Sequence, residues 1–501
     1  MGAQPGLFFL VLAAICATIN AIPTISAVGS KFFTSDGNQF YIKGVAYQLV
    51  EDDPLVNTTQ CTLDAALMQQ LGANTIRVYH VDASADHSGC MNAFAAVGIY
   101  LFVDMDSFTT YIRYDTDSSW TANKSASYRA VMDNFQQYDN TAGFFVGNEV
   151  LNTLADSGAA PYLLSAAADL KGYQDAKGYR KIPIGYSATD TAVLRPMLQD
   201  YLVCRPNVTE RLDFYALNSY EWCGSTPTFQ TSGYVELQAL AENYPVPIFF
   251  SEDGCNTVPP RTFDDQAAIF GPQMVDTWSG AIIYEWIQET NDYGLVSYGP
   301  QVGADVNDGS IIVQGFTRQG VPTPISPDFT NLQQQWKTLT PTGVSSAQYA
   351  ATVSTTVPAC PSSTAGGWTV DPSAPLPTIG VGAVSAGMPS DVPKGSITVT
   401  PSAAGTPSPS TSLSVSASST LPSVSTSQVS STYRSTVTPS SISSKASSTA
   451  SGSAAAGAAS ATTSKGAAGR SVSGPPSFTG VGFVGMVLSL ATVGAGVMVW
   501  L

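Results

Sequence analysis

The sequence predicts an α/β fold, a (β/α)8 TIM barrel followed by a disordered Ser/Thr-rich stalk, and three observations support this prediction. Eight apolar runs of strand length occur between residues 40 and 286, and helix-like segments such as "TLDAALMQQLG" separate most of them. Almost continuously apolar strands are buried on both faces, as in a parallel sheet. After about residue 360 the chain is rich in Ser, Thr, Ala, Pro and Gly, a composition that builds no hydrophobic core.

The eight runs have the length and composition of buried strands. They cover residues 40–47, 74–81, 98–106, 143–150, 181–188, 212–220, 245–254 and 279–286. Eight strand–helix alternations over about 250 residues are typical of a (β/α)8 barrel. A doubly wound open sheet is the alternative, and it is less favoured because no glycine-rich phosphate loop follows the first run.

The two ends of the chain have the composition of targeting segments. Residues 1–21, with the apolar stretch "LFFLVLAAICATINA", are typical of a signal peptide, and a buried first helix is the alternative. Residues 481–501 are apolar and uncharged, and a polar spacer and small residues precede them. This order predicts a GPI-attachment propeptide at 470–501 rather than a transmembrane tail. The candidate attachment residues are Gly466, Ala467, Ala468 and Gly469.

These boundaries predict a secreted module held at the outer face of the plasma membrane. A catalytic barrel with a C-terminal extension is expected at residues 22–360, and the stalk at 361–469. The net charge of −16 and the pI of about 4.4 would repel phosphate backbones, so nucleic acid is excluded as a partner.

The cysteines agree with secretion. Six remain after the predicted signal peptide, which suggests three disulfides, and the spacing alone leaves 15 pairings open. No C-x-x-C motif occurs, and the two histidines, His80 and His87, are expected at the surface, so no metal site and no cofactor are predicted. Three sequons predict N-glycosylation at Asn57, Asn123 and Asn207.

Polar and aromatic residues gather where the predicted strands end. Active sites of such barrels lie at the carboxyl ends of the strands. The residues expected there are Gln48, Tyr79, Asp104, Asp106, Asn148, Glu149, Asn218, Tyr220, Glu252, Tyr284 and Glu285.

Glu149 and Glu252 end the fourth and seventh strands, and no His or Lys of the ring can act as base. A facing pair of carboxyls, about 5–5.5 Å apart, suits retaining glycoside chemistry, in which one protonates the leaving oxygen and the other attacks the anomeric carbon. Glu149, which follows Asn148, is the expected acid/base, and Glu252 the nucleophile. The Tyr284 hydroxyl is expected to donate to Glu252 and keep it ionised.

Several motifs, in this order, resemble a known family. The motifs "KGVAYQ", "NTIRVYHVD", "GFFVGNEV", "LNSYEWCG", "FFSEDGCN" and "YEWIQETNDYGLV" resemble those of the fungal cell-wall β-1,3-glucanosyltransferases, the Gas/Gel/Phr group of glycoside hydrolase family 72. The resemblance covers residues 25 to 345, the stalk and the GPI signal. Only Cys360 follows residue 255, so the chain resembles the shorter subgroup without a cysteine-rich carbohydrate-binding module.

The resemblance implies the same two roles for Glu149 and Glu252. It also implies sugar contacts from Gln48, Tyr79, Asn148, Tyr220 and Tyr284. The implied disulfides are Cys61–Cys90, Cys204–Cys360 and Cys223–Cys255.

Three functions follow in order of preference. The first is a transferase that cleaves a β-1,3-glucan internally and passes the new reducing end to the non-reducing end of another glucan, which elongates the wall polymer. The second is a retaining β-1,3-glucan hydrolase, in which water takes the intermediate. The third, a non-catalytic glucan-binding wall protein, would have no need of both carboxyls.

Overall fold

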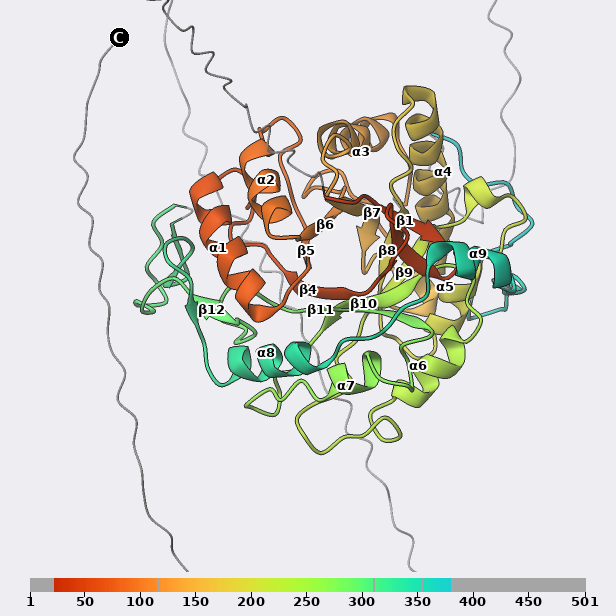
Figure 1. Cartoon of the computed structure of the whole chain (residues 1–501). Helices are drawn as coiled ribbons and strands as arrows, with labels where there is room; N and C mark the ends of the chain where they lie inside the picture. Colours follow the sequence, from red (N-terminus) through yellow and green to blue (C-terminus); the bar gives the residue numbers. More distant parts are fainter. Residues whose placement is uncertain (1–21, 115–117, 310, 354, 380–501) are drawn as a thin grey trace, which may run out of the picture. The chain divides into compact units, whose positions relative to one another are not determined.

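The computed structural model describes residues 22–379 apart from 115–117, 310 and 354, and within them the eight predicted runs form a closed barrel (Figure 1). All neighbouring strands are parallel, and the last pairs with the first. The barrel strands are β4 (Ile42–Ala46), β5 (Thr75–Val78), β6 (Tyr100–Asp104), β7 (Thr141–Asn148), β8 (Ile184–Thr189), β9 (Phe214–Asn218), β10 (Ile248–Asp253) and β11 (Trp278–Ile283). The predicted barrel is confirmed, and the open-sheet alternative is wrong. The predicted signal peptide, the propeptide and the stalk from residue 380 lie outside the described residues.

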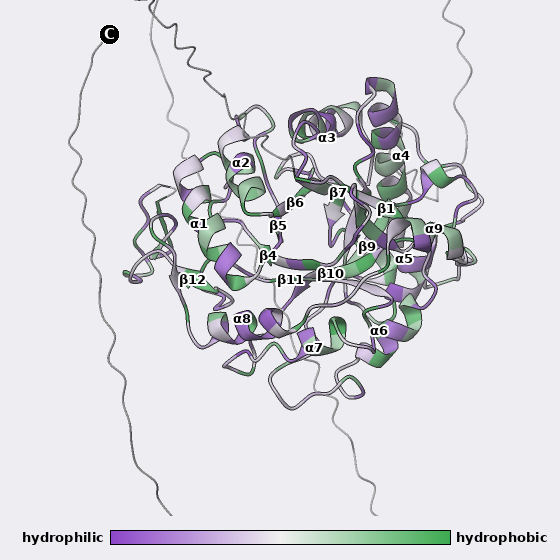
Figure 2. Ribbon diagram, in the orientation of Figure 1, coloured by the Kyte–Doolittle hydropathy of each residue, from purple (hydrophilic) through white to green (hydrophobic). Residues whose placement is uncertain are grey.

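Helices connect successive strands and form a ring around the barrel (Figure 1). Along this ring hydrophobic and hydrophilic residues alternate, as amphipathic helices require (Figure 2). Local signals set their ends: Asn57 accepts a hydrogen bond from the Gln60 amide at the start of α1, and Gly72 ends α1 with φ +93°. The helices are α1 (Thr58–Leu71), α2 (Ser88–Ala96), α3 (Ala122–Phe135), α4 (Ala160–Lys177), α5 (Arg195–Tyr201), α6 (Tyr234–Ala241), α7 (Asp265–Ile269) and α8 (Asp328–Thr338), with the 3-10 turns η1 (Leu154–Ala159) and η2 (Val208–Glu210).

A small antiparallel sheet closes the amino end of the barrel. It consists of β1 (Ile25–Val28), β2 (Lys31–Thr34) and β3 (Gln39–Phe40). Phe32 of β2 is fully buried, and its ring lies 5.9 Å from those of Phe102, Phe214 and Phe249, which point into the barrel. This aromatic layer fills the amino half of the barrel interior, so polar side chains can enter the interior only from the carboxyl ends of the strands.

The segment after β11 packs on the outside of the barrel. It contains two two-stranded sheets, β12 (Val296–Ser297) with β15 (Thr323–Pro324) and β13 (Ile312–Val313) with β14 (Phe316–Thr317), and ends in α9 (Ser346–Thr352). Trp368 is 1% exposed, and its ring lies 5.4 Å from that of Tyr201. The packed part therefore extends past residue 360, where the stalk was expected to begin.

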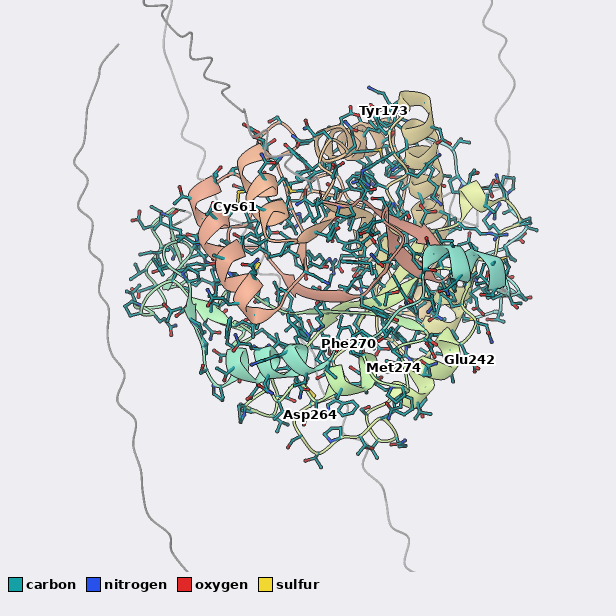
Figure 3. All side chains as sticks on the ribbon, in the orientation of Figure 1. Cys61, Tyr173, Glu242, Asp264, Phe270 and Met274 are labelled. Carbon is teal, nitrogen blue, oxygen red and sulfur yellow. A yellow bond between two sulfur atoms is a disulfide. The ribbon has the colours of Figure 1, made fainter. Side chains whose placement is uncertain are left out.

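Side chains fill the space between strands and helices (Figure 3). Three disulfides link the connecting segments. They are Cys61–Cys90, Cys204–Cys360 and Cys223–Cys255, the pairs that the family resemblance implied. Cys61–Cys90 joins α1 to α2, and Cys223–Cys255 joins the loops that follow β9 and β10. The last pair therefore fixes two neighbouring loops at the carboxyl end of the barrel.

The surface features of the sequence are partly as expected. The three sequon asparagines are exposed. His87, expected at the surface, is buried: its Nε2 lies 2.8 Å from the Asp53 carboxylate and its Nδ1 2.9 Å from the Asn134 side-chain oxygen. Although burial lowers the pKa of His87, these partners raise it overall. The buried contact between His87 and Asp53 links the loop that precedes α1 to the start of α2. Among the described residues, no helix is both long and apolar enough to cross a membrane.

Candidate active site

The inward-facing side chains change from apolar to polar along each strand. On β9, Phe214 and Ala216 belong to the buried apolar cluster and Asn218 ends the strand; on β6, Phe102 is followed by Asp104. Because side chains alternate with a period of two, these residues share the inner face. A polar layer therefore lies on the aromatic layer at the carboxyl ends of the strands, where barrel enzymes have their active sites.

Glu252, near the end of β10, accepts hydrogen bonds from two tyrosines. The Tyr79 hydroxyl donates to Oε1 at 3.0 Å, and the Tyr220 hydroxyl donates to Oε2 at 2.8 Å. The expectation that Tyr284 supplies this hydrogen bond is wrong: its ring instead packs edge-on against Tyr79, 6.5 Å away between centroids. Two donors hold the Glu252 carboxylate in one orientation.

Glu149 directly follows β7, at a sharp turn of the backbone. Its φ of +47° lies in the left-handed region, which a non-glycine residue adopts only where its surroundings impose it. Its amide donates to the Ser187 carbonyl on β8 at 2.9 Å, and Asn218 Nδ2 donates to its Oε1 at 2.9 Å. The turn and the amide of Asn218 thus direct the Glu149 carboxyl toward the mouth that also holds Glu252.

Arg77 of β5 contacts Glu252 directly and is linked to Glu149 through Asn218, whose Oδ1 lies 3.5 Å from the Arg77 Nη1. Its guanidinium donates to both Asp104 oxygens, at 3.1 and 2.8 Å, and its Nη1 lies 3.5 Å from Glu252 Oε1. The same group donates to Asn148 Oδ1 at 2.9 Å and rests on the Tyr79 ring at 4.3 Å. Sequence reasoning missed Arg77, although a lone cation inside the apolar run "NTIRVYHV" signals a buried partner, since unpaired charges are not buried.

The groups around Glu252 have opposing effects on its pKa. Burial raises the pKa of Glu252 to about 7. The charge of Arg77 lowers it, the charge of Glu149 raises it, and the hydrogen bonds from Tyr220 and Tyr79 lower it. Arg77 and the two tyrosines therefore favour the ionised form of Glu252, whereas burial and the charge of Glu149 oppose it.

Two other predicted residues make hydrogen bonds that position the candidate site: Asn148 contacts side chains, and Gln48 contacts backbone groups. Asn148 Oδ1 accepts hydrogen bonds from Arg77, from Ser187 Oγ and from Asn218 Nδ2. Gln48 Oε1 accepts from the Tyr79 amide at 2.9 Å, and its Nε2 donates to the Val50 carbonyl at 2.8 Å. Gln48 therefore positions Tyr79 from the end of β4.

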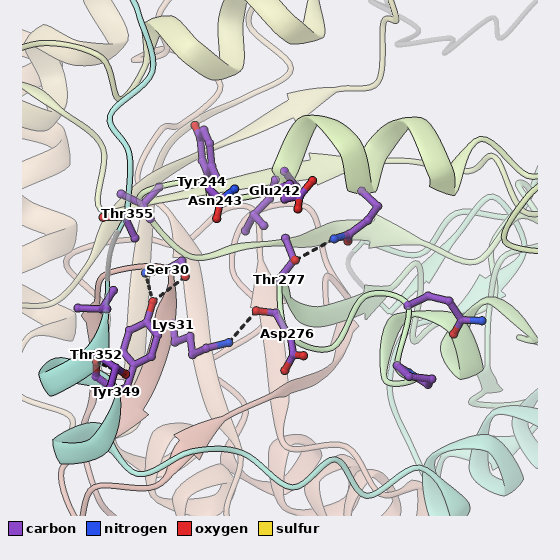
Figure 4. A pocket seen from close by; sticks show the side chains of 17 residues that line it. Ser30, Lys31, Glu242, Asn243, Tyr244, Asp276, Thr277, Tyr349, Thr352 and Thr355 are labelled. Carbon is purple, nitrogen blue, oxygen red and sulfur yellow. Dashed lines mark hydrogen bonds between the residues drawn. The ribbon is translucent and has the colours of Figure 1, made fainter.

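A separate cavity lies at the other end of the barrel. Its volume is about 480 Å³, and the segments that precede β10 and β11 line it together with the turn between β1 and β2 and with α9 (Figure 4). Lys31 donates to the Asp276 carbonyl at 2.8 Å inside it. None of its lining residues belongs to the carboxylate site, so the two are distinct.

Comparison with known proteins identifies a family model and several similar proteins. Residues 14–311 match the family model described as glucanosyltransferase, glycoside hydrolase family 72. The chain is 40% identical over 382 residues to the 1,3-beta-glucanosyltransferase gas2 of Schizosaccharomyces pombe, which covers 73% of this chain and 78% of the relative. It is 36% identical over 344 residues to the 1,3-beta-glucanosyltransferase GAS2 of Saccharomyces cerevisiae, covering 65% of this chain and 58% of that protein.

Solved structures are consistent with the same family. Saccharomyces cerevisiae Gas2p, as a mutant in complex with laminaritetraose and laminaripentaose, superimposes with a TM-score of 0.63 and 36% identity, over 71% of this chain and 75% of that one. The chain spans only about half the length of several other relatives, such as PGA5 of Candida albicans, at 51%. The match to the family model and the identity to the fission-yeast relative show that the chain belongs to the glucanosyltransferase family of glycoside hydrolases, family 72.

Proposed function

We propose that this protein is a β-1,3-glucanosyltransferase that acts by a retaining double displacement, with Glu252 as nucleophile and Glu149 as acid/base. The observation that carries the proposal is the largely buried Glu252 carboxylate, held by two tyrosine hydroxyls and by Arg77 at the mouth that Glu149 also faces. Such a pair of carboxyls is what a retaining mechanism requires.

In the first step Glu149 gives its proton to the glycosidic oxygen while a Glu252 oxygen attacks the anomeric carbon. The bond between that carbon and the oxygen breaks, the distal part of the glucan leaves with a new hydroxyl, and the rest stays as an ester on Glu252. Attack requires the ionised form of Glu252. The charge of Arg77 and the two tyrosine hydrogen bonds favour that form against burial.

In the second step the Glu149 carboxylate takes the proton from a 3-hydroxyl at the non-reducing end of another glucan. That oxygen attacks the anomeric carbon and releases Glu252, so the new bond has the original configuration. Asn148 supports both steps: its carbonyl oxygen is occupied by three donors, which leaves its NH2 group to hold a sugar hydroxyl beside the reacting carbon. Tyr284, whose ring adjoins Tyr79, is proposed as a further sugar contact.

A water molecule in place of the acceptor would make the enzyme a hydrolase with the same residues. Transfer to a sugar needs an acceptor that is held in the site, because an oriented acceptor has a high effective concentration. The relatives named above are glucanosyltransferases, and one of them was crystallised with laminari-oligosaccharides. These findings support transfer to β-1,3-glucan.

The experiment is to incubate the purified protein with a reduced β-1,3-glucan oligosaccharide and to measure product lengths by mass spectrometry. Products longer than the substrate are expected, and products that are all shorter would make the protein a hydrolase. Glu149→Gln and Glu252→Gln are each expected to remove both kinds of product. The matched control is Asp52→Asn, which changes an exposed acidic residue on the loop before α1 and should leave the products unchanged.

We also propose that the protein acts at the outer face of the plasma membrane, held by a GPI lipid through one of the four small residues at 466–469. The three disulfides support passage through an oxidising compartment. Cleavage by a phosphatidylinositol-specific phospholipase C should release the protein from cell membranes. Retention on the membrane after complete cleavage of a known GPI protein would refute the anchor.

A further inference from the structure

Exposed aromatic side chains occur in one place on the described surface. Phe108 is 52% exposed, Tyr111 40% and Tyr114 57%. Every other Phe, Tyr and Trp side chain of the described residues is buried or half-buried. All three lie within seven residues, on the loop that follows β6 at the carboxyl end of the barrel. Single exposed apolar residues need no explanation, but a cluster on one loop indicates a binding surface.

The loop holds these rings outward by burying the residues between them. Thr110 is buried, and its hydroxyl hydrogen-bonds to Ser107 Oγ at 2.6 Å and to Ser127 Oγ of α3 at 2.9 Å. Ile112 is 2% exposed and belongs to the main core. Thr110 lies between Phe108 and Tyr111, and Ile112 lies between Tyr111 and Tyr114, so turning the aromatic side chains inward would displace a buried neighbour.

The aromatic loop is continuous with the active site. The Phe108 ring lies 4.0 Å from the His80 ring, and His80 directly follows Tyr79, which donates to Glu252. At its start, the loop continues from Asp104, the ion-pair partner of Arg77. A ligand that extends from the carboxylates across Tyr79 and His80 therefore meets the Phe108 ring next.

We propose that Phe108, Tyr111 and Tyr114 form an aromatic ledge that binds glucosyl units of a β-1,3-glucan at a distance from the reacting bond. A pyranose ring has an apolar C–H face with hydroxyls around its edge, so it can cover an aromatic ring while its hydroxyls stay in water. Aromatic side chains suit such a ligand because they offer a large contact area with little loss of conformational entropy. The inference rests on the proposed function and adds to it a length-dependent part of substrate binding.

The test measures binding as a function of chain length. The Glu149→Gln protein is used as the background, because it keeps the site and does not consume the ligand, and affinities for β-1,3-linked oligosaccharides of increasing length are measured by calorimetry. Tyr111→Ala and Phe108→Ala, alone and combined, are each compared with this background. Tyr111→Phe is the matched variant, since it removes the hydroxyl and keeps the ring, and thermal melting checks that each variant folds.

The ledge predicts that the combined alanine variant loses about tenfold in affinity for the longest oligosaccharide and nothing for the shortest one that binds. Tyr111→Phe should bind every length as the background does. An equal loss at all lengths, or no loss at any length, would overturn the inference while leaving the proposed function intact. If the background protein binds no β-1,3-glucan at all, the proposed function itself has failed and the ledge with it.

Discussion

Replacing Glu252 by Gln should stabilise the protein at neutral pH while it removes activity. Burial raises the pKa of Glu252 from 4.5 to about 7, so ionising this group costs more in the folded than in the unfolded chain. At about 1.36 kcal/mol per pKa unit, the cost at pH 7 is about 3 kcal/mol. Glutamine has nearly the same shape and no charge, so Glu252→Gln avoids that cost.

The size of the stabilisation by Glu252→Gln depends on pH within a defined window. Below pH 4.5 the carboxyl is protonated in both the folded and the unfolded chain, so wild type and variant should be equally stable there. As the pH rises from 4.5 to about 7, the unfolded chain loses this proton first, and the wild type becomes less stable relative to the variant.

Differential scanning calorimetry at pH 4 and pH 7 tests this. A folded unit of roughly 350 residues has an unfolding entropy near 0.7 kcal/mol/K, so about 3 kcal/mol corresponds to a Tm increase of about 4 °C at pH 7. At pH 4 the difference should vanish. Asp52→Asn, at an exposed acidic residue, serves as control and should change Tm little at either pH. A variant Tm below that of the wild type at pH 7 would refute the reasoning. So would a Tm difference between variant and wild type that is the same at both pH values.

Three further perturbations have defined outcomes. Tyr220→Phe removes a hydrogen bond to ionised Glu252 and so should move the acid limb of the kcat/KM profile to higher pH; an unmoved limb would contradict the assigned hydrogen bond. His87→Gln should lower Tm more at pH 5.5 than at pH 8, because a raised pKa gives stability below about 6.5 that is lost as the pH rises through the folded-state value; equal losses would exclude a charged imidazole. Replacing Cys204 and Cys360 together by serine removes a disulfide of sequence separation 156 and should lower the free energy of unfolding, measured in urea, by about 5 kcal/mol. Little change would show that the segment around Cys360 stays packed without the disulfide.

The barrel could be predicted because its strands are long enough and apolar enough to stand out from the helices between them. The β1–β3 sheet was not predicted, since strands of two to four residues give too short a pattern. Trp368 was assigned to the stalk because a single aromatic residue in a Pro- and Ser-rich segment carries no periodic signal. Its burial depends on a contact with Tyr201 that only the folded chain reveals.

The active site was predictable to the level of strand ends and no further. Glu149 and Glu252 could be found because each carboxyl lies near the end of an apolar run, one polar residue after it. The tyrosines that contact Glu252 could not be identified, because the register of β10 shifts between Phe250 and Glu252 and the direction of the Glu252 side chain depends on that register. Tyr79 and Tyr220, not Tyr284, therefore make the hydrogen bonds to Glu252.

The position of Arg77 also bears on how the barrel assembles. Its guanidinium bonds to side chains from strands that are distant in sequence, on β6, β7, β8 and β9, and reaches Glu252 on β10. A barrel missing one of these strands would hold a cation in an apolar interior without its full set of acceptors, which is costly. Partly closed intermediates are therefore penalised, so the last strands should join in one concerted event, and a chain that has completed this event already holds Glu149 and Glu252 in place.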